Sequence, residues 1–247
     1  MRSLKHILLS VLVLTRVFCI AQNPPVWKDI TKEQAKQFMR EMKIWLDKHP
    51  DYSVDVNYYS YKSYTDVTPA DKSAGYIKKE GSNMNSLNIG VRNVQNSSYF
   101  ISMDTTQKIM LIANPKNNTK SFSSIDTSQI MKQVNKFKTS SNTGESALRI
   151  EYKNNPSIGS VEIFTDKNGE LKKIVWYYSG SIPNLDKKDK EYSLPKVEVV
   201  FSNYKLNVNF DKREFDEKQF FTLKDKVFVP TQKYRDYKIK DTRYEKH

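Results

Sequence analysis

The sequence predicts an α+β fold that consists mainly of antiparallel β-sheet. Roughly ten or eleven short segments of alternating apolar residues follow one another at about ten-residue spacing, which is typical of antiparallel strands. Two helical patterns are inserted among these segments instead of alternating with them, which argues against a doubly wound parallel sheet. The aromatic content of 12% supplies the apolar area of a folded core and argues against a disordered chain.

The amino terminus has the pattern of a secretory signal peptide. Arg2 and Lys5 precede the apolar segment 7–14, and a small-residue cleavage site follows at Ala21. The apolar segment is shorter than the roughly 20 residues of a membrane-spanning helix, which leaves a short uncleaved anchor as the alternative. We expect a cleaved signal peptide over residues 1–21, a single β-rich domain over residues 22–247, and export to the periplasm or cell envelope of a bacterium.

The first element of the domain is predicted to be a helix over Thr31–Asp47. Thr31 and Gln34 match a capping box, and Pro50 ends the pattern. Apolar residues recur every three or four positions, so they share one face of the helix. This face is expected to be packed core or a lid over an apolar cavity, and it consists of Ala35, Phe38, Met39, Met42, Trp45 and Leu46.

Strands are predicted next, from the alternation of apolar and polar residues. Residues 52–58, 87–91 and 99–103 alternate with a period of two, which is typical of half-buried strands. A polar turn at 104–107 leads into the segment 109–113. This last segment is apolar on both faces, so we expect it to be covered on both sides.

The middle of the chain is predicted to contain a loop, a second helix and a hairpin. A polar loop at 115–124 is followed by a helix at about 127–138, capped by Asp126. A Ser/Thr-rich loop is expected at 139–146. Asn168-Gly169 between two apolar runs predicts a β-hairpin. The helix is expected to present Ile130, Met131, Val134 and Phe137 on one side.

The remaining segments are predicted to be strands and one charged loop. Strands are expected at 171–178 and 196–204, on either side of the solvated loop 184–191. Closing strands are expected at 220–229 and 231–239, with a break at Pro230.

The inventory of reactive residues argues against an enzyme. One Cys and three His cannot build a thiolate metal cluster, so we expect neither a metal site nor a cofactor. The seven glycines are isolated, so no phosphate-binding loop is predicted. Asp55, Asp104 or Glu162 could be nominated as glycosidase carboxylates, but the sequence gives no distance between them. His49, at a helix end, is better explained by the helix dipole than by a catalytic triad.

The net charge of +13 limits the classes of partner. Basic residues are spread along the chain without forming a stripe, and a signal peptide removes the protein from nucleic acid, so we expect no nucleic-acid binding. The charge favours attraction to anionic headgroups or glycans, and it allows peripheral contact with a membrane.

The order of elements resembles the periplasmic lipoprotein-carrier superfamily, which is LolA-like. The resemblance covers nearly all of residues 22–247 as an order of elements without a diagnostic motif. It rests on the helix Thr31–Asp47, the strand YSVDVNYYSY (Tyr52–Tyr61), the pair YFISMDTTQKIMLIANP (Tyr99–Pro115) and the late segment VEVVFSNYKLNVNFD (Val197–Asp211).

The resemblance implies a half-open barrel that encloses an apolar cavity under two covering helices. Such a cavity would hold the acyl chains of a lipid or lipidated passenger, and the inward residues of the strands would be the site. No motif places the family's functional arginine. The residues implied to line the cavity are Val54, Val56, Tyr58, Leu87, Ile89, Val91, Trp176 and Tyr178 from strands, with Trp45 and Phe137 from helices.

A second hypothesis is a non-catalytic binding or scaffold module of the cell envelope. It would have the same residues in a filled core, and exposed Tyr and Lys side chains would bind an envelope protein partner. An apolar void beneath the helices would favour the carrier, whereas a packed interior with an exposed aromatic patch would favour the module.

Overall fold

The computed structural model describes residues 25–115, 133–142, 144–180 and 194–244. These residues contain fifteen strands, three short 3-10 helices and the α-helix α2, so strands are more numerous than the sequence predicts. The expected signal peptide, the loops at 116–124 and 184–191, and the first part of the second helix (127–132) lie outside the described residues.

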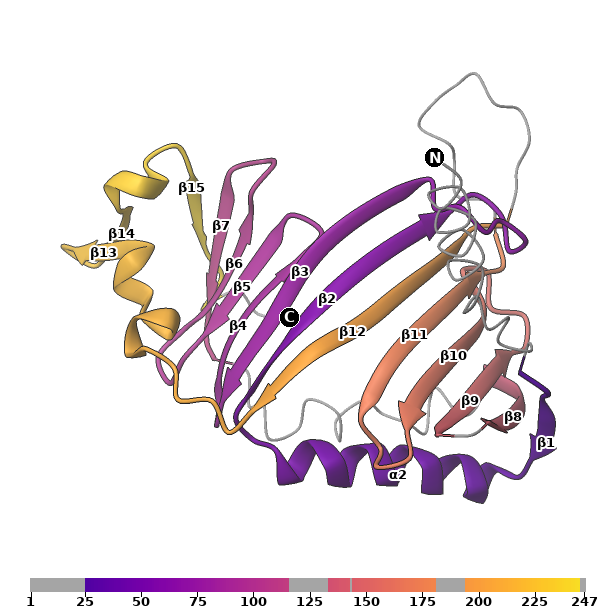
Figure 1. The fold of residues 1–247 in the computed structure, drawn as a ribbon. Helices are drawn as coiled ribbons and strands as arrows, with labels where there is room; N and C mark the ends of the chain where they lie inside the picture. The colour runs from indigo at the N-terminus through magenta and orange to yellow at the C-terminus, as the bar shows by residue number, and fades with distance from the viewer. Residues whose placement is uncertain (1–24, 116–132, 143, 181–193, 245–247) are drawn as a thin grey trace, which may run out of the picture.

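Thirteen strands form one curved sheet in the order β1-β8-β9-β10-β11-β12-β2-β3-β4-β5-β6-β7-β15 (Figure 1). Neighbouring strands are antiparallel, except that β15 runs parallel to β7. Within the described chain β1 and β15 are the two edges, so the sheet is open. The strands are β1 Lys28–Ile30, β2 Tyr52–Tyr61, β3 Asp71–Glu80, β4 Asn83–Asn88, β5 Val91–Gln95, β6 Phe100–Asp104, β7 Ile109–Ala113, β8 Val134–Asn142, β9 Glu145–Tyr152, β10 Ile158–Asp166, β11 Leu171–Tyr178, β12 Lys196–Leu206 and β15 Lys238–Asp241.

Helix α2 (Lys32–Lys48) runs along one end of β9 to β12 (Figure 1). Its start is fixed by the expected capping box, in which the Thr31 side chain accepts from the Gln34 amide and Gln34 reaches back to the Thr31 backbone. The sheet face that α2 covers is called the helix face below. The apolar side of α2 meets strands β8 and β9 there, where Ala35, Phe38 and Met39 pack against Phe137, Leu148 and Ile150.

The carboxy-terminal residues form a small lobe on the other side of the sheet. This C-terminal lobe contains η2 (Lys212–Phe215), η3 (Glu217–Gln219), the hairpin β13 (Phe221–Lys224) and β14 (Val227–Pro230), and η4 (Gln232–Tyr234). The face that it covers is called the lobe face. The core between them joins Phe220, Phe221, Phe228 and Tyr234 of the lobe to Val94, Ile101, Met103, Met110 and Ile112 of the sheet.

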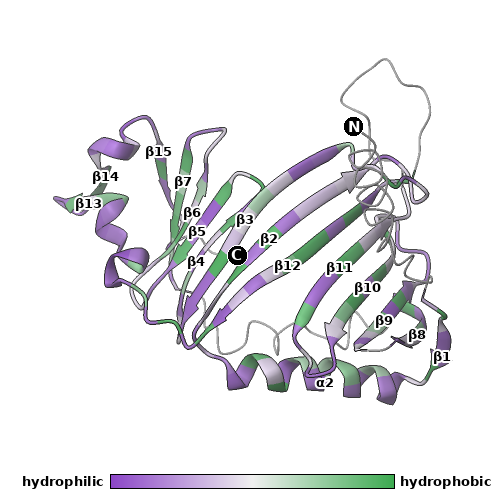
Figure 2. Cartoon of the chain, in the orientation of Figure 1, coloured by the Kyte–Doolittle hydropathy of each residue, from purple (hydrophilic) through white to green (hydrophobic). Residues whose placement is uncertain are grey.

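The strand register shows that the two cores lie on opposite faces of one sheet. Side chains of directly paired residues share a face. Val54 pairs with Ile77 and Ile77 with Ser86, so the helix face turns from apolar to polar between β2 and β4. On the lobe face, Leu87 pairs with Arg92 and Arg92 pairs with Met103, so the side chains on that face become apolar toward β7. Figure 2 shows apolar stretches in the strands on either side of β3.

We call β8–β12 with β2 the helix half, and β4–β7 with β15 the lobe half; β3 lies between them. Gly75 sits in β3 at this junction, paired with Val56. A Cβ atom at Gly75 would lie 1.9 Å from the carbonyl oxygen of Leu87. Glycine is therefore required at this position, because any side chain would collide with the backbone of β4.

Most of the predicted elements are confirmed. The first helix and the strands predicted at 52–58, 99–103, 109–113, 171–178 and 196–204 are present, with turns at 104–107 and 166–169.

The prediction of a second helix is wrong over 134–138, and the loop prediction at 139–146 is also wrong. Val134 and Phe137 belong to strand β8, which continues to Asn142 and pairs with β9. In the β8–β9 hairpin, every second side chain of β8 lies on the helix face. Phe137 is one of these side chains, and it lies beside Ile150. Pairing therefore overrides the helix-like spacing of the apolar residues.

Three further expectations are corrected. The segment 87–91 is two strands joined by a turn, because Ile89 and Gly90 have φ angles of 44° and 77°. Strand β7 is covered on one face only, since Leu111 is 37% exposed between buried Met110 and Ile112. The closing segments are shorter than predicted: β13 and β14 form a separate hairpin, and only β15 joins the main sheet.

Candidate functional site

The helix face of the helix half carries two continuous rows of apolar side chains. Antiparallel register places one residue from each strand side by side in each row. A row of five such residues spans about 19 Å across the sheet. The first row is Phe137, Ile150, Val161, Trp176 and Val197, and the second is Leu148, Ile163, Ile174, Val199 and Tyr58.

Beside these rows, small buried residues are flanked by larger half-buried ones. Val54, Val56 and Val199 are 2%, 1% and 4% exposed. Around them lie larger apolar side chains that keep part of their surface in contact with solvent. The result is an apolar surface with a valine floor and aromatic sides, formed by Tyr58, Ile77, Trp176, Val197 and Phe201.

Helix α2 covers one end of this surface and is fixed there by Trp45. The Trp45 ring meets the Tyr204 ring edge-on at 5.3 Å between centroids. The Tyr204 hydroxyl donates to the Leu171 carbonyl oxygen at 3.0 Å, and burial raises the pKa of Tyr204, so it remains a neutral donor. The end of α2 is thereby held against β11 and β12.

At the border with the lobe half, Tyr58 marks the change from apolar to polar residues. Its hydroxyl donates to the Asn88 side-chain oxygen at 2.5 Å, and burial raises its pKa. Beyond it, the row that continues from Ile77 carries Ser86, Asn93 and Ser102 across β4 to β6. This row of apolar side chains therefore ends at β3, although the same face of the lobe half also carries Met84, Val91 and Phe100 in other rows.

The structure places seven of the ten sequence-predicted site residues on the helix face of the helix half. Val54, Val56, Tyr58, Trp176 and Tyr178 come from its strands. Phe137 comes from β8 and not from a helix, and with Trp45 of α2 it packs where the helix meets the sheet.

The other three predicted residues lie elsewhere. Leu87 is on the lobe face beside Arg92. Ile89 is in the β4–β5 turn and is 60% exposed, so it does not point into the sheet surface. Val91 is on the helix face, but it lies in the lobe half, where it pairs with Asn88 at the end of β4.

Sequence reasoning missed several residues of the apolar surface. Ile77 lies in β3, whose charged and polar sequence gives no alternating signal. The alternation in 196–204 does predict that Val197 and Phe201 share one face of their strand, but they were not named among the residues of the site.

A separate cavity of about 410 Å³ lies between α2 and the ends of β8, β9 and β10. Phe38 and Met42 contribute apolar area, but Glu41, Asp166 and Lys167 also line it. Charged groups of this kind disfavour an acyl chain. This cavity is therefore poorly suited to a hydrocarbon chain.

On the lobe face, the helix half carries a charged ladder instead of an apolar surface. Arg149 Nη1 lies 3.0 Å from Glu162 Oε1, and the Tyr177 hydroxyl donates to Glu162 Oε2 at 3.1 Å. Glu162 is 5% exposed, and burial raises its pKa while the Arg149 guanidinium opposes that shift. The pKa of Tyr177 is raised by burial and by the Glu162 carboxylate.

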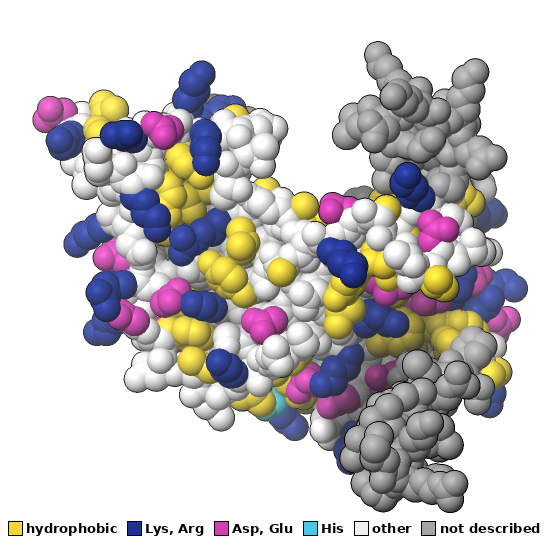
Figure 3. All heavy atoms as spheres, turned by 45° about the horizontal axis from the view of Figure 1, so that its top comes forward, with side chains coloured by type: hydrophobic (Ala, Val, Ile, Leu, Met, Phe, Trp, Pro, Cys, Tyr) yellow, Lys and Arg dark blue, Asp and Glu magenta, His cyan; other side chains and the backbone are white. Residues whose placement is uncertain are grey.

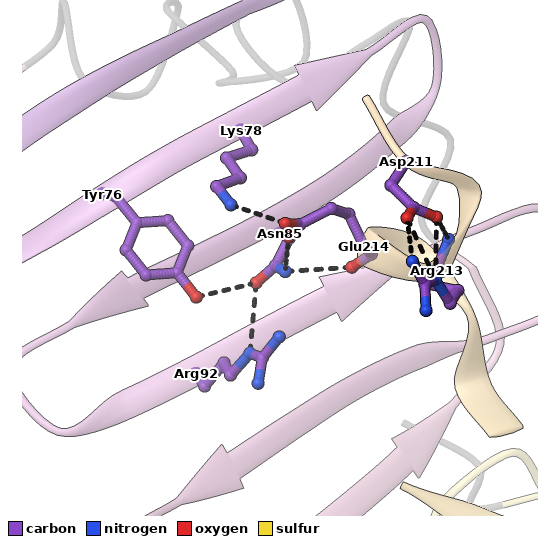
Figure 4. A network of polar contacts seen from close by, with 7 residues as sticks. All are labelled: Tyr76, Lys78, Asn85, Arg92, Asp211, Arg213 and Glu214. Carbon is purple, nitrogen blue, oxygen red and sulfur yellow. Dashed lines mark hydrogen bonds and ion pairs between the residues drawn. The ribbon is translucent and has the colours of Figure 1, made fainter. Parts of the chain in front are cut away.

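A polar network around Asn85 fastens the C-terminal lobe to the sheet (Figure 4). The Asn85 amide donates to the Glu214 carbonyl oxygen at 2.9 Å, and its side-chain oxygen accepts from Tyr76 and Arg92. Lys78 Nζ lies 2.8 Å from the Glu214 carboxylate. Asn85 is fully buried and its groups are partnered, so we assign the network a structural role.

Two observations limit other kinds of site. In the described ranges, His, Cys, Asp and Glu side chains form no group of three or more that could hold a metal ion. Among the helices of the described residues, none is long and apolar enough to cross a membrane.

Several solved structures are similar to this chain at about 10% identity. The lipoprotein LppX from Mycobacterium tuberculosis matches with a TM-score of 0.35, covering 73% of this chain and 100% of that chain. A LolA superfamily protein from Nitrosomonas europaea matches with a TM-score of 0.30, covering 74% and 98% of the two chains. A DUF1329 family protein from Desulfovibrio piger matches with a TM-score of 0.30, covering 75% and 97%.

One of these structures is thus a LolA superfamily protein, the superfamily that the order of elements in the sequence resembles. The sequence matches no family model, and it matches none of the curated proteins with which it was compared. We therefore base the functional proposal on the residues of this chain.

Proposed function

We propose that this protein is an exported cell-envelope protein that binds acyl chains, of lipids or of lipidated proteins, on the helix face. One observation supports the proposal above all. Half-buried Tyr58, Trp176 and Phe201 extend an apolar surface across several strands, while α2 covers only one end of it. The proposed activity is binding and transport without catalysis.

The chemistry of this surface suits a flexible hydrocarbon chain. Each methylene group removed from water contributes about 0.8 kcal/mol, so affinity for an acyl chain should rise with its length. The valine floor beneath Phe201 and Trp176 offers contacts without a polar group, and aromatic side chains at the sides can turn to admit a chain. The polar row of Ser86, Asn93 and Ser102 beyond Ile77 would limit the spread of the chain past β3.

A second candidate is a non-catalytic binding or scaffold module whose β core is filled. The observation that favours it is that Val54 and Val56 are already buried by the chain's own side chains. In that function the helix face would be core, and an envelope protein partner would bind elsewhere on the molecule. The two candidates differ in whether a hydrocarbon chain can reach the valine floor.

The test is a titration of the purified protein with fluorescent fatty acids of increasing chain length. Phe201→Asp places a charge on the half-buried surface, and Ile89→Asp places the same charge on the exposed β4–β5 turn. The proposal predicts affinity that rises with chain length in the wild type and in Ile89→Asp, and weak binding in Phe201→Asp.

Circular dichroism checks that both variants are folded. Absence of chain-length dependence in a folded wild type would contradict acyl-chain binding and would favour the filled module.

A further inference from the structure

The hairpin β13–β14 presents an apolar tip at the far end of the C-terminal lobe (Figure 1). Leu223 is 54% exposed and Val227 is 62% exposed. Leu223 pairs with Phe228 and Val227 pairs with Lys224, so the two exposed apolar side chains lie on opposite faces of the hairpin. Each face of the tip therefore carries one exposed apolar side chain, and Lys224 shares the face of Val227.

The base of the hairpin is held firmly, so the tip has a defined position. The Phe221 and Phe228 rings meet edge-on at 4.8 Å, and the Tyr99 ring of the sheet lies 5.4 Å from Phe221. The Arg243 guanidinium lies 4.5 Å from the centre of the Phe228 ring. These contacts pack the inner part of the hairpin against the sheet beside β6, whereas Leu223 and Val227 at the tip are not part of the core.

The turn of the hairpin keeps a lysine where glycine would fit better. Asp225 and Lys226 have φ angles of 49° and 67°, in the left-handed region. Hairpin turns of this kind favour Asn-Gly, because glycine adopts such angles without steric cost. Lys226 therefore places a cation in the turn at a cost in backbone strain.

The turn at the tip carries more basic than acidic residues. Lys224 and Lys226 flank Asp225, so the turn has a net positive charge. Exposed Lys218 and Lys233 lie in the 3-10 helices of the lobe, where Glu217 lies next to Lys218. At the upper left of Figure 3, Lys and Arg side chains lie beside hydrophobic ones over the lobe, with acidic side chains between them.

We propose that this hairpin tip docks on a lipid bilayer that carries anionic headgroups. Leu223 and Val227 enter the interfacial layer, and Lys224 and Lys226 pair with lipid phosphates. Apolar insertion and charge attraction then act together, since each lysine near an anionic surface strengthens binding about fivefold. The docking site is separate from the helix face and does not require acyl-chain binding.

The test is sedimentation of the full chain with vesicles of phosphatidylcholine, with and without phosphatidylglycerol. We expect binding to the anionic vesicles that falls at least about tenfold in the double variant Leu223→Ser, Val227→Ser. The matched control Val67→Ser removes an apolar side chain that is 91% exposed in the β2–β3 loop, and it should bind as the wild type does.

Lys226→Gly separates docking from folding. It should raise the melting temperature, because glycine relieves the left-handed turn, while it weakens binding to anionic vesicles about fivefold. Equal binding to both kinds of vesicle, or unchanged binding in the double variant, would overturn the proposal. Fatty-acid titration of the double variant should match the wild type, so failure of docking and failure of acyl-chain binding are distinguishable.

Discussion

The two halves of the sheet are built alike but bury opposite faces. In the lobe half, the chain supplies its own cover, because Phe220, Phe221 and Phe228 fill the lobe face of β5 to β7. In the helix half, α2 covers one end of the other face, and large side chains such as Trp176 and Phe201 stay half-buried. The difference shows that apolar alternation predicts a buried face without saying what buries it. In the proposed function, the lobe half is core and a ligand completes the helix half.

The inversion of faces takes place over a single strand. On β3, Ile77 points to the helix face with Val54, and Tyr76 points to the lobe face with Leu87. The polar sequence of β3 lets both of its faces be partly wet, and Gly75 lets β4 approach closely. Strand β3 therefore joins two parts of one sheet that bury opposite faces, and the hydrogen-bonded pairing continues across it.

The largest expected effect compares equal truncations in the core under the C-terminal lobe and on the helix face. Phe220→Ala should lower the free energy of unfolding by about 3–5 kcal/mol, because Phe220 is fully buried against Tyr234 and the Arg92 guanidinium. Phe201→Ala should lower it by less than about 2 kcal/mol, since its side chain is half-buried. Urea unfolding measures both. Similar losses would show that the helix face is as tightly packed as the lobe core.

The next effect tests the junction. Gly75→Ala should destabilise the protein by about 1–3 kcal/mol or more, because the new methyl group meets the Leu87 carbonyl oxygen. Gly159→Ala is the matched control, because its methyl group would meet the nearest atom at 3.6 Å, an ordinary contact. Thermal unfolding of the two variants should differ clearly. A Gly75→Ala protein as stable as Gly159→Ala would mean that β3 and β4 are not tightly joined there.

A smaller effect is expected at the start of α2. Thr31→Ala removes the side chain that caps the helix and should cost about 1 kcal/mol. Because α2 packs on β8 and β9, amide exchange should quicken in those strands and stay unchanged in β5 to β7. Hydrogen exchange by mass spectrometry resolves the two groups. Uniform loss of protection would show that the halves unfold as one unit.

The smallest effect concerns the charged ladder of the helix half. Burial raises the pKa of Glu162 above its ordinary 4.5, so the folded protein holds this proton more tightly than the unfolded chain does. The contribution of Glu162 to stability is therefore fully present below pH 4.5 and is lost as pH rises through the folded pKa.

Urea unfolding at a series of pH values measures this contribution. The free energy of unfolding of the wild type minus that of Glu162→Gln should fall as pH rises from about 4 to about 7. A difference that rises over this range would reverse the sign and show that the pairing with Arg149 outweighs burial.

The sequence predicted elements well where a local signal dominates. The capping box at Thr31 and Gln34 and the turn at Asn168-Gly169 need no distant partner, and both are present. The prediction from the sequence failed where pairing with another strand decides the local structure. Phe137 has the spacing of a helix but lies in β8 because β9 supplies a partner strand, and Ile89 has the alternation of a strand but lies in a turn that Gly90 permits.

The candidate site was predicted only in part, because strand pairing also decides which residues share a face. Alternation identified Val54, Val56 and Trp176, but the face that each strand turns toward its neighbour depends on register. Leu87 was therefore assigned to the wrong group: the inversion at β3 puts it on the lobe face. Ile77 was missed because the surrounding residues of β3 are charged.

The most direct test of the account is the location of a bound hydrocarbon chain. A fatty acid with a photoreactive group near its methyl end is bound to the purified protein and irradiated, and the modified peptides are identified by mass spectrometry. We predict adducts on β2, β11 and β12, close to Tyr58, Trp176 and Phe201. Adducts confined to the lobe half, or distributed without preference between the two halves, would contradict the account.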